Sequence, residues 1–240
     1  MKNLQNNWRT LTTKNLSAKD NMDLDLFLLN EFIEKDLTPI LRFYSWEKPT
    51  ISLGRSQNLD EIDIEYCKKN NIDIVKRQTG GKAVFHQGEF TYSFIASKKF
   101  GLSDNIFDSY KQISEAIIFS LNKLKKLDLF IGNETKKYFT SSFCFATSSV
   151  SDINFGGKKF IGSAQLRKGS NLLQHGSIII NQDFSLLKNI FKGHINIEEQ
   201  INLSEILGFI PTFEELEHVL LAGFSEFFEV YFEKIIYTYS

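Results

Sequence analysis

Short strand-like runs, several of them separated by glycine turns, fill the middle of this chain and restrict its fold more than any other feature. Gly80-Gly81 and Gly156-Gly157 each stand between two such runs. Because glycine reverses the backbone where other residues resist it, this pattern predicts mostly antiparallel strands joined by tight turns. The strand-like runs are residues 39–46, 50–53, 73–78, 83–86, 89–96, 152–155, 159–166 and 176–181.

Amphipathic segments flank these runs. Apolar residues recur at helical spacing over 20–35, 106–125 and 213–232, and a shorter helix is expected over 63–70. The order predicts an α+β fold, with mixed, mainly antiparallel sheets flanked by helices. No linker or repeat interrupts the chain, so we expect one domain over 1–240, with 195–240 as a helical C-terminal tail packed on it.

Composition excludes several classes of protein. Lys and Arg number 28 and Asp and Glu 29, and this net charge of −1 argues against nucleic-acid binding. No apolar run approaches the roughly 20 residues that span a bilayer, and the first residues lack a signal-peptide segment, so a cytoplasmic location away from membranes is expected. The cysteines Cys67 and Cys144 predict no disulfide framework, and the scattered histidines predict no metal site.

The first candidate motif is the run 76–86, KRQTGGKAVFH. The N–H groups of a Gly-Gly turn can face a carboxylate, phosphate or thioester oxygen, and Arg77 can aim a cation at the same place. His86 ends the strand that follows. A plain hairpin turn with a surface arginine is the alternative, because the motif is neither a dinucleotide fingerprint nor a P-loop.

The second motif is GGKKFIGSAQ, residues 156–165. Because strand side chains alternate, Lys158 and Lys159 should point in opposite directions, one outward and one inward. An inward lysine can favour a thiolate or hold a carbonyl oxygen. The small residues Gly162-Ser163-Ala164 mark a place where a ligand or another backbone comes close. Two solvated lysines in a hairpin are the alternative.

Two further residues carry candidate chemistry. Cys144 lies in the hydroxyl-rich segment SSFCFATSS and becomes a nucleophile where a nearby cation favours its thiolate. A buried, inert thiol is the alternative, and it is the expectation for Cys67. His175, followed by Gly176 at the start of a strand-like run, either positions substrate or is a hydrogen-bonded end residue.

Taken in order, four segments resemble the catalytic domain of the lipoate–protein ligase and octanoyltransferase family, which is related to biotin protein ligases. They are NMDLDLFLL, LRFYSWEKPTISLGRSQ, KRQTGGKAVFHQGEFTYS and KKFIGSAQLRKGSNLLQHGSIII. The resemblance covers about residues 20–190 and implies the fold of that family. It assigns Cys144 and Lys159 a catalytic role. The substrate-binding residues that it implies are Arg77, Gly80, Gly81, Ala83, Val84, His86, Gly162, Ser163, Ala164, His175 and Gly176.

Cys144 separates the branches of this family. The sequence is most similar to the cysteine-dependent octanoyltransferases, in which a loop cysteine accepts the acyl group. That branch implies no cofactor, octanoyl-acyl carrier protein as donor, and the lysine of a lipoyl domain (glycine-cleavage H protein or an E2 subunit) as acceptor. We expect a monomer, with Val84, Phe85 and Phe143 lining a tunnel for an eight-carbon chain.

Besides a non-catalytic carrier-binding module or degenerate paralogue, two enzymatic alternatives remain. One is an ATP-dependent lipoate–protein ligase, in which Lys159 binds an acyl-adenylate. The other is an amidotransferase that moves octanoyl groups between lipoyl domains. Two positions depart from the family pattern. Gln78 stands where the family often has Pro or Arg, and Gln87 stands where it often has Asp. An Asp after the histidine would suit a nucleotide–metal site, so its absence favours a transferase over a nucleotide-dependent ligase.

Overall fold

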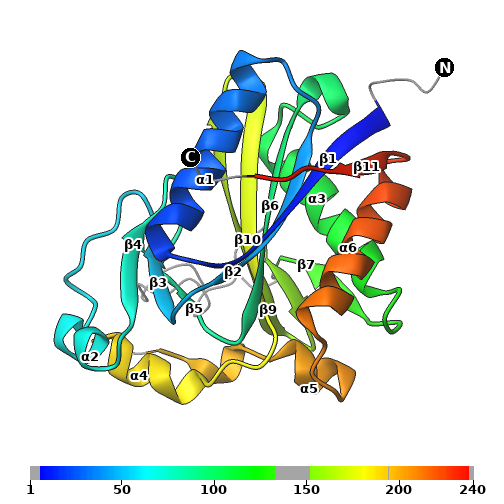
Figure 1. The fold of residues 1–240 in the computed structure, drawn as a ribbon. Helices are drawn as coiled ribbons and strands as arrows, with labels where there is room; N and C mark the ends of the chain where they lie inside the picture. The colour runs from blue at the N-terminus through cyan, green and yellow to red at the C-terminus, as the bar shows by residue number, and fades with distance from the viewer. Residues whose placement is uncertain (1–5, 133–151, 194, 238–240) are drawn as a thin grey trace.

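The computed structural model describes residues 6–132, 152–193 and 195–237, and the description below concerns those residues. They form a large sheet in the order β11-β1-β2-β6-β10-β9-β8-β7 and a small sheet in the order β4-β3-β5 (Figure 1). In the large sheet β1 runs parallel to β2 and β11, and the other neighbours pair antiparallel. In the small sheet β3 is parallel to β4 and antiparallel to β5.

The strands are β1 (Asn7–Leu16), β2 (Ile40–Trp46), β3 (Thr50–Leu53), β4 (Asp73–Lys76), β5 (Val84–His86), β6 (Glu89–Ser97), β7 (Leu129–Ile131), β8 (Ile153–Phe155), β9 (Lys158–Lys168), β10 (Asn171–Ile179) and β11 (Tyr231–Lys234). The α-helices are α1 (Ala18–Glu34), α2 (Ile64–Lys69), α3 (Ile106–Leu121), α4 (Leu187–Ile190), α5 (Leu203–Leu207) and α6 (Phe213–Phe227).

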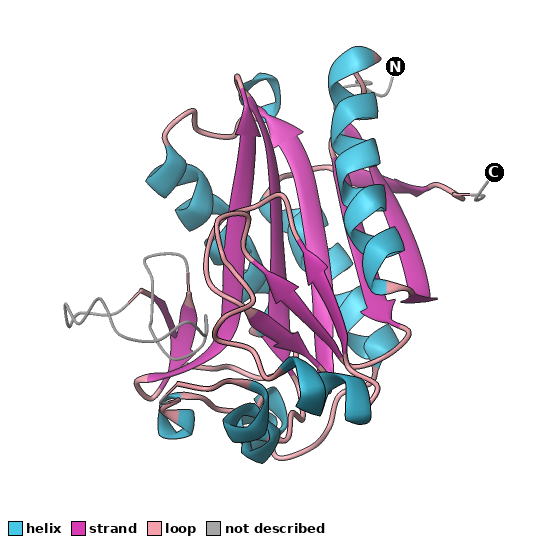
Figure 2. Cartoon of the chain, turned by 90° about the vertical axis from the view of Figure 1, so that its left-hand side faces the viewer, coloured by secondary structure: helices cyan, strands magenta, loops and turns pink. Residues whose placement is uncertain are grey.

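Helix α1 covers one face of the large sheet. The Ser17 hydroxyl caps its first turn by accepting a hydrogen bond from the backbone N–H of Asp20. Leu28 and Leu29 pack in one buried cluster with Ile40 of β2 and Ile95 of β6. In Figure 2 this long helix lies along one side of the strands. Its apolar residues therefore pack on one face of the central strands β2 and β6.

Helices α3 and α6 cover the opposite face. Phe94 of β6 packs in the main core cluster with Ile117 of α3 and Phe224 of α6. The two helices cross closely, since a Cβ at Gly223 would lie 1.9 Å from the Ser120 hydroxyl. The neighbouring side chains Phe94 and Ile95 thus point to opposite faces of the sheet, Phe94 toward α3 and α6 and Ile95 toward α1. Both faces of the sheet are therefore buried there.

The small sheet has a core of its own with α2 and α4. Ile51 of β3 and Phe85 of β5 pack there with Cys67 of α2 and Ile190 of α4. Ile179, at the end of β10, joins the same cluster and so connects the small sheet to the large one. This contact places β3 and β5 beside the middle of the large sheet.

The predicted fold class, α+β with mixed, mainly antiparallel sheets, is confirmed. Strand β1 had not been predicted, and the helix expected over 213–232 ends at Phe227, before strand β11. The segment from 195 onward therefore contains α5, α6 and a strand that pairs with β1. That 1–240 form a single domain stays a prediction.

Two further searches cover the described part of the chain. None of its helices combines the length and the apolar character that crossing a bilayer requires. In the same residues, no three His, Cys, Asp or Glu side chains gather in a way that would hold a metal ion.

Candidate active site

A small, partly open cavity of about 30 Å³ lies where the small sheet faces β9 and β10. We call it the central cavity. Its lining residues are Met22, Tyr44, Trp46, Ser52, Arg77, Val84, His86, Thr91, Gly162, Ser163, Ala164, His175, Gly176 and Ser177.

The structure brings most of the predicted substrate-binding residues together around this cavity. The predicted residues in its lining are Arg77, Val84, His86, Gly162, Ser163, Ala164, His175 and Gly176. Gly80, Gly81, Ala83 and Lys159 are not in the lining. The first two belong to the turn that Arg77 holds, and Ala83 is fully buried beside it. Whether any of them touches substrate stays a prediction.

Small residues make room for the cavity on β9 and β10. Gly176 pairs across the sheet with Ser163 on one side and Tyr92 on the other. A Cβ at Gly176 would lie 2.6 Å from Cε1 of Tyr92 and 2.7 Å from the Ser163 oxygen. Tyr92 and Ser163 share a 2.8 Å hydrogen bond between their hydroxyls. Burial raises the pKa of Tyr92 to about 12, although bonds from Ser163 and Gln174 oppose the rise, so it acts as a neutral hydroxyl.

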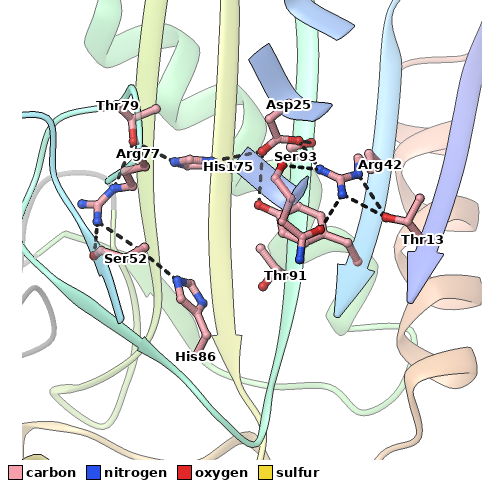
Figure 3. A network of polar contacts seen from close by, with 12 residues as sticks. Thr13, Asp25, Arg42, Ser52, Arg77, Thr79, His86, Thr91, Ser93 and His175 are labelled. Carbon is pink, nitrogen blue, oxygen red and sulfur yellow. Dashed lines mark hydrogen bonds and ion pairs between the residues drawn. The ribbon is translucent and has the colours of Figure 1, made fainter. Parts of the chain in front are cut away.

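A buried ion pair forms one end of a polar network beside the cavity (Figure 3). Asp25 of α1 and Arg42 of β2 lie 2.6 Å apart, and both side chains are almost fully buried. The Asp25 carboxylate also accepts a hydrogen bond from Ser93, at 2.7 Å. Burial alone would raise the pKa of Asp25, but Arg42, His175 and Ser93 together lower it below its usual value. The carboxylate is therefore ionised at neutral pH.

His175 connects this ion pair to the Gly80-Gly81 turn. Its Nδ1 lies 3.2 Å from Asp25 Oδ2, and its Nε2 lies 2.7 Å from Oγ1 of Thr79. Arg77 then donates to Thr79 Oγ1 through Nε, at 3.1 Å. The other nitrogens of Arg77 donate to the carbonyl oxygens of Ser52, Gly80 and Lys82 at 2.6–2.9 Å. The guanidinium thus braces the turn from inside.

His86 lies on the other side of the cavity. It stacks on Trp46 with ring centroids 4.1 Å apart, and its Nε2 lies 2.8 Å from the Ser52 hydroxyl. Its Nδ1 is 3.5 Å from a carboxylate oxygen of Glu89. Burial lowers the pKa of His86, Glu89 partly offsets this, and Arg77 and His175 add to the lowering. The imidazole is neutral at physiological pH.

Lys159 points inward, as the alternation predicts, while Lys158 is exposed. Its Nζ lies 2.9 Å from Oδ2 of Asp152, and both side chains are at most 2% exposed. The sequence interpretation did not foresee this carboxylate. Cys144 and Phe143 lie outside the described residues, so the distance from the thiol to Lys159 stays open.

Sequence reasoning missed several residues of this site. Asp25 and Thr79 carry the network, and Trp46 and Met22 line the cavity. Asp25 did carry a signal, because it falls on the buried side of an amphipathic helix, where an acid requires a partner. Phe85, expected in the tunnel, packs instead in the core of the small sheet, since strand side chains alternate and its neighbour Val84 takes the cavity side.

An α+β fold with a mostly apolar cavity between the small sheet and the large one is the arrangement of a small-molecule site. The chain matches the family model described as the lipoyl protein ligase A/B catalytic domain over residues 17–225. The chain therefore belongs to that family, and the resemblance noted in its sequence is confirmed.

Individual relatives agree. Octanoyltransferase LipM of Carboxydothermus hydrogenoformans is 38% identical over 94% of this chain and 88% of its own length. Octanoyltransferase LipM of Bacillus subtilis is 37% identical over 77% of this chain and 69% of its own. A crystal structure of lipoate-protein ligase A bound with ATP matches with a TM-score of 0.76 at 26% identity, covering 96% of this chain and 90% of that one.

Proposed function

We propose that this protein is an octanoyltransferase of protein lipoylation, which takes an octanoyl group from acyl carrier protein and passes it to the lysine of a lipoyl domain. The observation that carries the proposal is the similarity, over most of the chain, to relatives named octanoyltransferase LipM. The central cavity supports it, because apolar side chains such as Met22, Tyr44 and Val84 suit an alkyl chain. Burial of six additional methylene groups at about 0.8 kcal/mol each would favour octanoyl over acetyl by roughly 5 kcal/mol.

The first half-reaction is a thioester exchange. The Cys144 thiolate attacks the carbonyl carbon of the octanoyl thioester, and a tetrahedral oxyanion forms. The oxyanion collapses, the bond to the carrier sulfur breaks, and that sulfur leaves as a thiolate, which takes up a proton. One thioester replaces another, so the step is close to neutral in free energy and requires no ATP.

The second half-reaction makes the amide. The neutral ε-amine of the acceptor lysine attacks the acyl-enzyme carbonyl, the nitrogen passes one proton to water, and the C–S bond breaks so that Cys144 leaves as a thiolate. In both halves negative charge develops on the carbonyl oxygen, and N–H groups of the Gly80-Gly81 turn are the donors that we assign to it. Lys159 is assigned to favour the thiolate, with Asp152 holding its ammonium in place.

The proposed partners follow from these two steps. The donor is octanoyl-acyl carrier protein, and the acceptor is a lipoyl domain such as the glycine-cleavage H protein or an E2 subunit. The protein acts as a monomer without a cofactor. The cytoplasmic location expected from its sequence is part of the same proposal.

Intact-mass measurement tests the covalent route. Incubation with octanoyl-acyl carrier protein should add one octanoyl group to the wild type and none to Cys144→Ala. Cys67→Ala is the matched control and should keep the adduct, because Cys67 is buried in α2 and burial, together with Asp63, raises the pKa of its thiol. An adduct that survives Cys144→Ala would refute the acyl-cysteine.

A second arm separates transferase from ligase. The wild type is incubated with free octanoate, a lipoyl domain and MgATP, without acyl carrier protein. The proposal predicts no octanoylated lipoyl domain under these conditions. ATP-dependent octanoylation would instead identify a lipoate–protein ligase.

A further inference from the structure

The turn after β4 is built around a buried side chain. Arg77 is 4% exposed and donates to the carbonyls of Gly80 and Lys82, so the loop wraps its own guanidinium. Gly54 approaches from β3, where a Cβ would lie 1.9 Å from the carbonyl oxygen of Gly81. The position of the Gly80-Gly81 backbone therefore depends on where the Arg77 side chain sits.

Thr79 fixes that side chain. Its Oγ1 receives the Nε–H of Arg77 at 3.1 Å and lies 2.7 Å from Nε2 of His175. Thr79 is 1% exposed and is not among the residues that line the central cavity. Among the described residues, the side-chain partners through which the Thr79 hydroxyl can act are Arg77 and His175.

The hydrogen-bond donors and acceptors of these side chains complement one another from Asp25 to Arg77. The ionised Asp25 carboxylate can only accept, so His175 donates from Nδ1. Nε2 of the same ring lies 2.7 Å from the Thr79 hydroxyl, which can either donate to that nitrogen or accept from it. The Thr79 oxygen keeps its lone pairs for Arg77. Asp25 of α1 thus orients His175, His175 contacts Thr79, and Thr79 contacts Arg77 in the turn.

We propose that Thr79 and His175 are positioning residues of the transferase: they carry the orientation set by the Asp25 carboxylate to Arg77, and so place the backbone N–H groups of the Gly80-Gly81 turn for the reacting carbonyl. The inference rests on the proposed function. A donor misplaced by about 1 Å can lower a rate on the order of a hundredfold, so a hydroxyl remote from the substrate can control turnover.

The turn has other attachments, which make the proposal testable without unfolding it. The backbone N–H of Arg55 donates to the Thr79 carbonyl, and that of Arg77 donates to the Leu53 carbonyl, each at 2.9 Å. Ser52 also accepts from Arg77. Loss of the Thr79 hydroxyl should therefore leave the fold intact and loosen only the placement of the turn.

Thr79→Val, Thr79→Ser and the wild type are compared in transfer from octanoyl-acyl carrier protein to a lipoyl domain. Valine keeps the shape and removes the hydroxyl, so kcat should fall at least tenfold while KM for the donor stays within about twofold. Serine restores the hydroxyl and should restore kcat. Thr10→Val is the matched control, a buried threonine of β1 whose hydroxyl donates to the Leu41 carbonyl, and it should keep wild-type kinetics.

Hydrogen exchange gives a readout that does not depend on activity. Amides of residues 80–83 should exchange faster in Thr79→Val than in Thr79→Ser or Thr10→Val. If Thr79→Val does not fold, His175→Phe is used in its place. This variant removes the hydrogen bond between His175 and Thr79 and keeps the one between Thr79 and Arg77. Wild-type kcat in a folded Thr79→Val, or no rescue by serine, would overturn the inference. A wild type without transferase activity would refute the proposed function alone, and the exchange comparison would still decide whether Thr79 holds the turn.

Discussion

Lys159 Nζ and Asp152 Oδ2 form a 2.9 Å ion pair between two side chains that are at most 2% exposed. Lys159 lies on β9, three residues before the small residues of the central cavity, and Asp152 directly precedes β8. Removing either partner leaves the other charge buried without its counterion, whereas removing both does not. This asymmetry allows the structural and the catalytic role of the lysine to be measured separately.

Lys159→Met and Asp152→Asn should each destabilise the protein, by about 3–5 kcal/mol, because each strands a buried charge. The double variant should recover most of that stability. Its transferase activity should stay lost, since the ammonium assigned to the thiolate is gone. Urea unfolding and octanoyl transfer, measured on the same samples, check both statements. A double variant that regains activity along with stability would show that Lys159 is only structural.

Asp25 predicts a dependence of stability on acid. Its folded pKa lies below its usual 3.8, because Arg42 and the other partners outweigh desolvation. Its contribution to stability is therefore complete above about pH 3.8 and is lost as the pH falls through the lower, folded pKa. Asp25→Asn should be less stable at pH 7, by about 3–5 kcal/mol, because Arg42 is left unpaired. It should also lose less stability than the wild type between pH 4 and pH 2, measured by urea unfolding at each pH.

Local patterns predicted most of the elements that build the site. The strand over 50–53 and the turn at Gly80-Gly81 follow from β-branched residues and glycine, which act on the backbone directly. The inward direction of Lys159 followed from alternation alone. These features depend on a few neighbouring residues, and so a single sequence carries them.

Long-range pairing was not available from the sequence. Strand β1 escaped prediction because its alternation is irregular, and its register is set by parallel partners β2 and β11. The link from His175 to Thr79 spans 96 residues, and that from His175 to Asp25 spans 150. No local pattern marks which buried histidine meets which buried acid. The sequence thus predicted many of the residues that line the cavity, but not the hydrogen bonds that connect Asp25, His175 and Thr79 behind them.

His86 predicts a second dependence on pH, with a different window. Burial lowers its folded pKa below the usual 6.5, although Glu89 opposes the shift. His86 therefore binds a proton more readily in the unfolded protein than in the folded one. Its contribution to the free energy of unfolding is fully present above about pH 6.5 and declines as the pH falls below that value. His86→Gln should flatten this decline in unfolding measurements between pH 7 and pH 5. His218→Gln, an exposed histidine on α6, is the control and should behave as the wild type.

Gly54 predicts a steric test of the turn. A Cβ at Gly54 would lie 1.9 Å from the Gly81 carbonyl oxygen and 2.9 Å from its carbon, both backbone atoms that can move only with the turn. Gly54→Ala should therefore cost about 1–3 kcal/mol of stability, as overpacking does, or displace the turn. In either case octanoyl transfer should fall at least tenfold, because the N–H donors move away from the carbonyl. Gly193→Ala is the matched control, since its Cβ would meet nothing within 4 Å, and both its stability and its activity should stay at the wild-type level. Full activity in Gly54→Ala, at wild-type stability, would mean that the Gly80-Gly81 turn is not held where this close contact puts it.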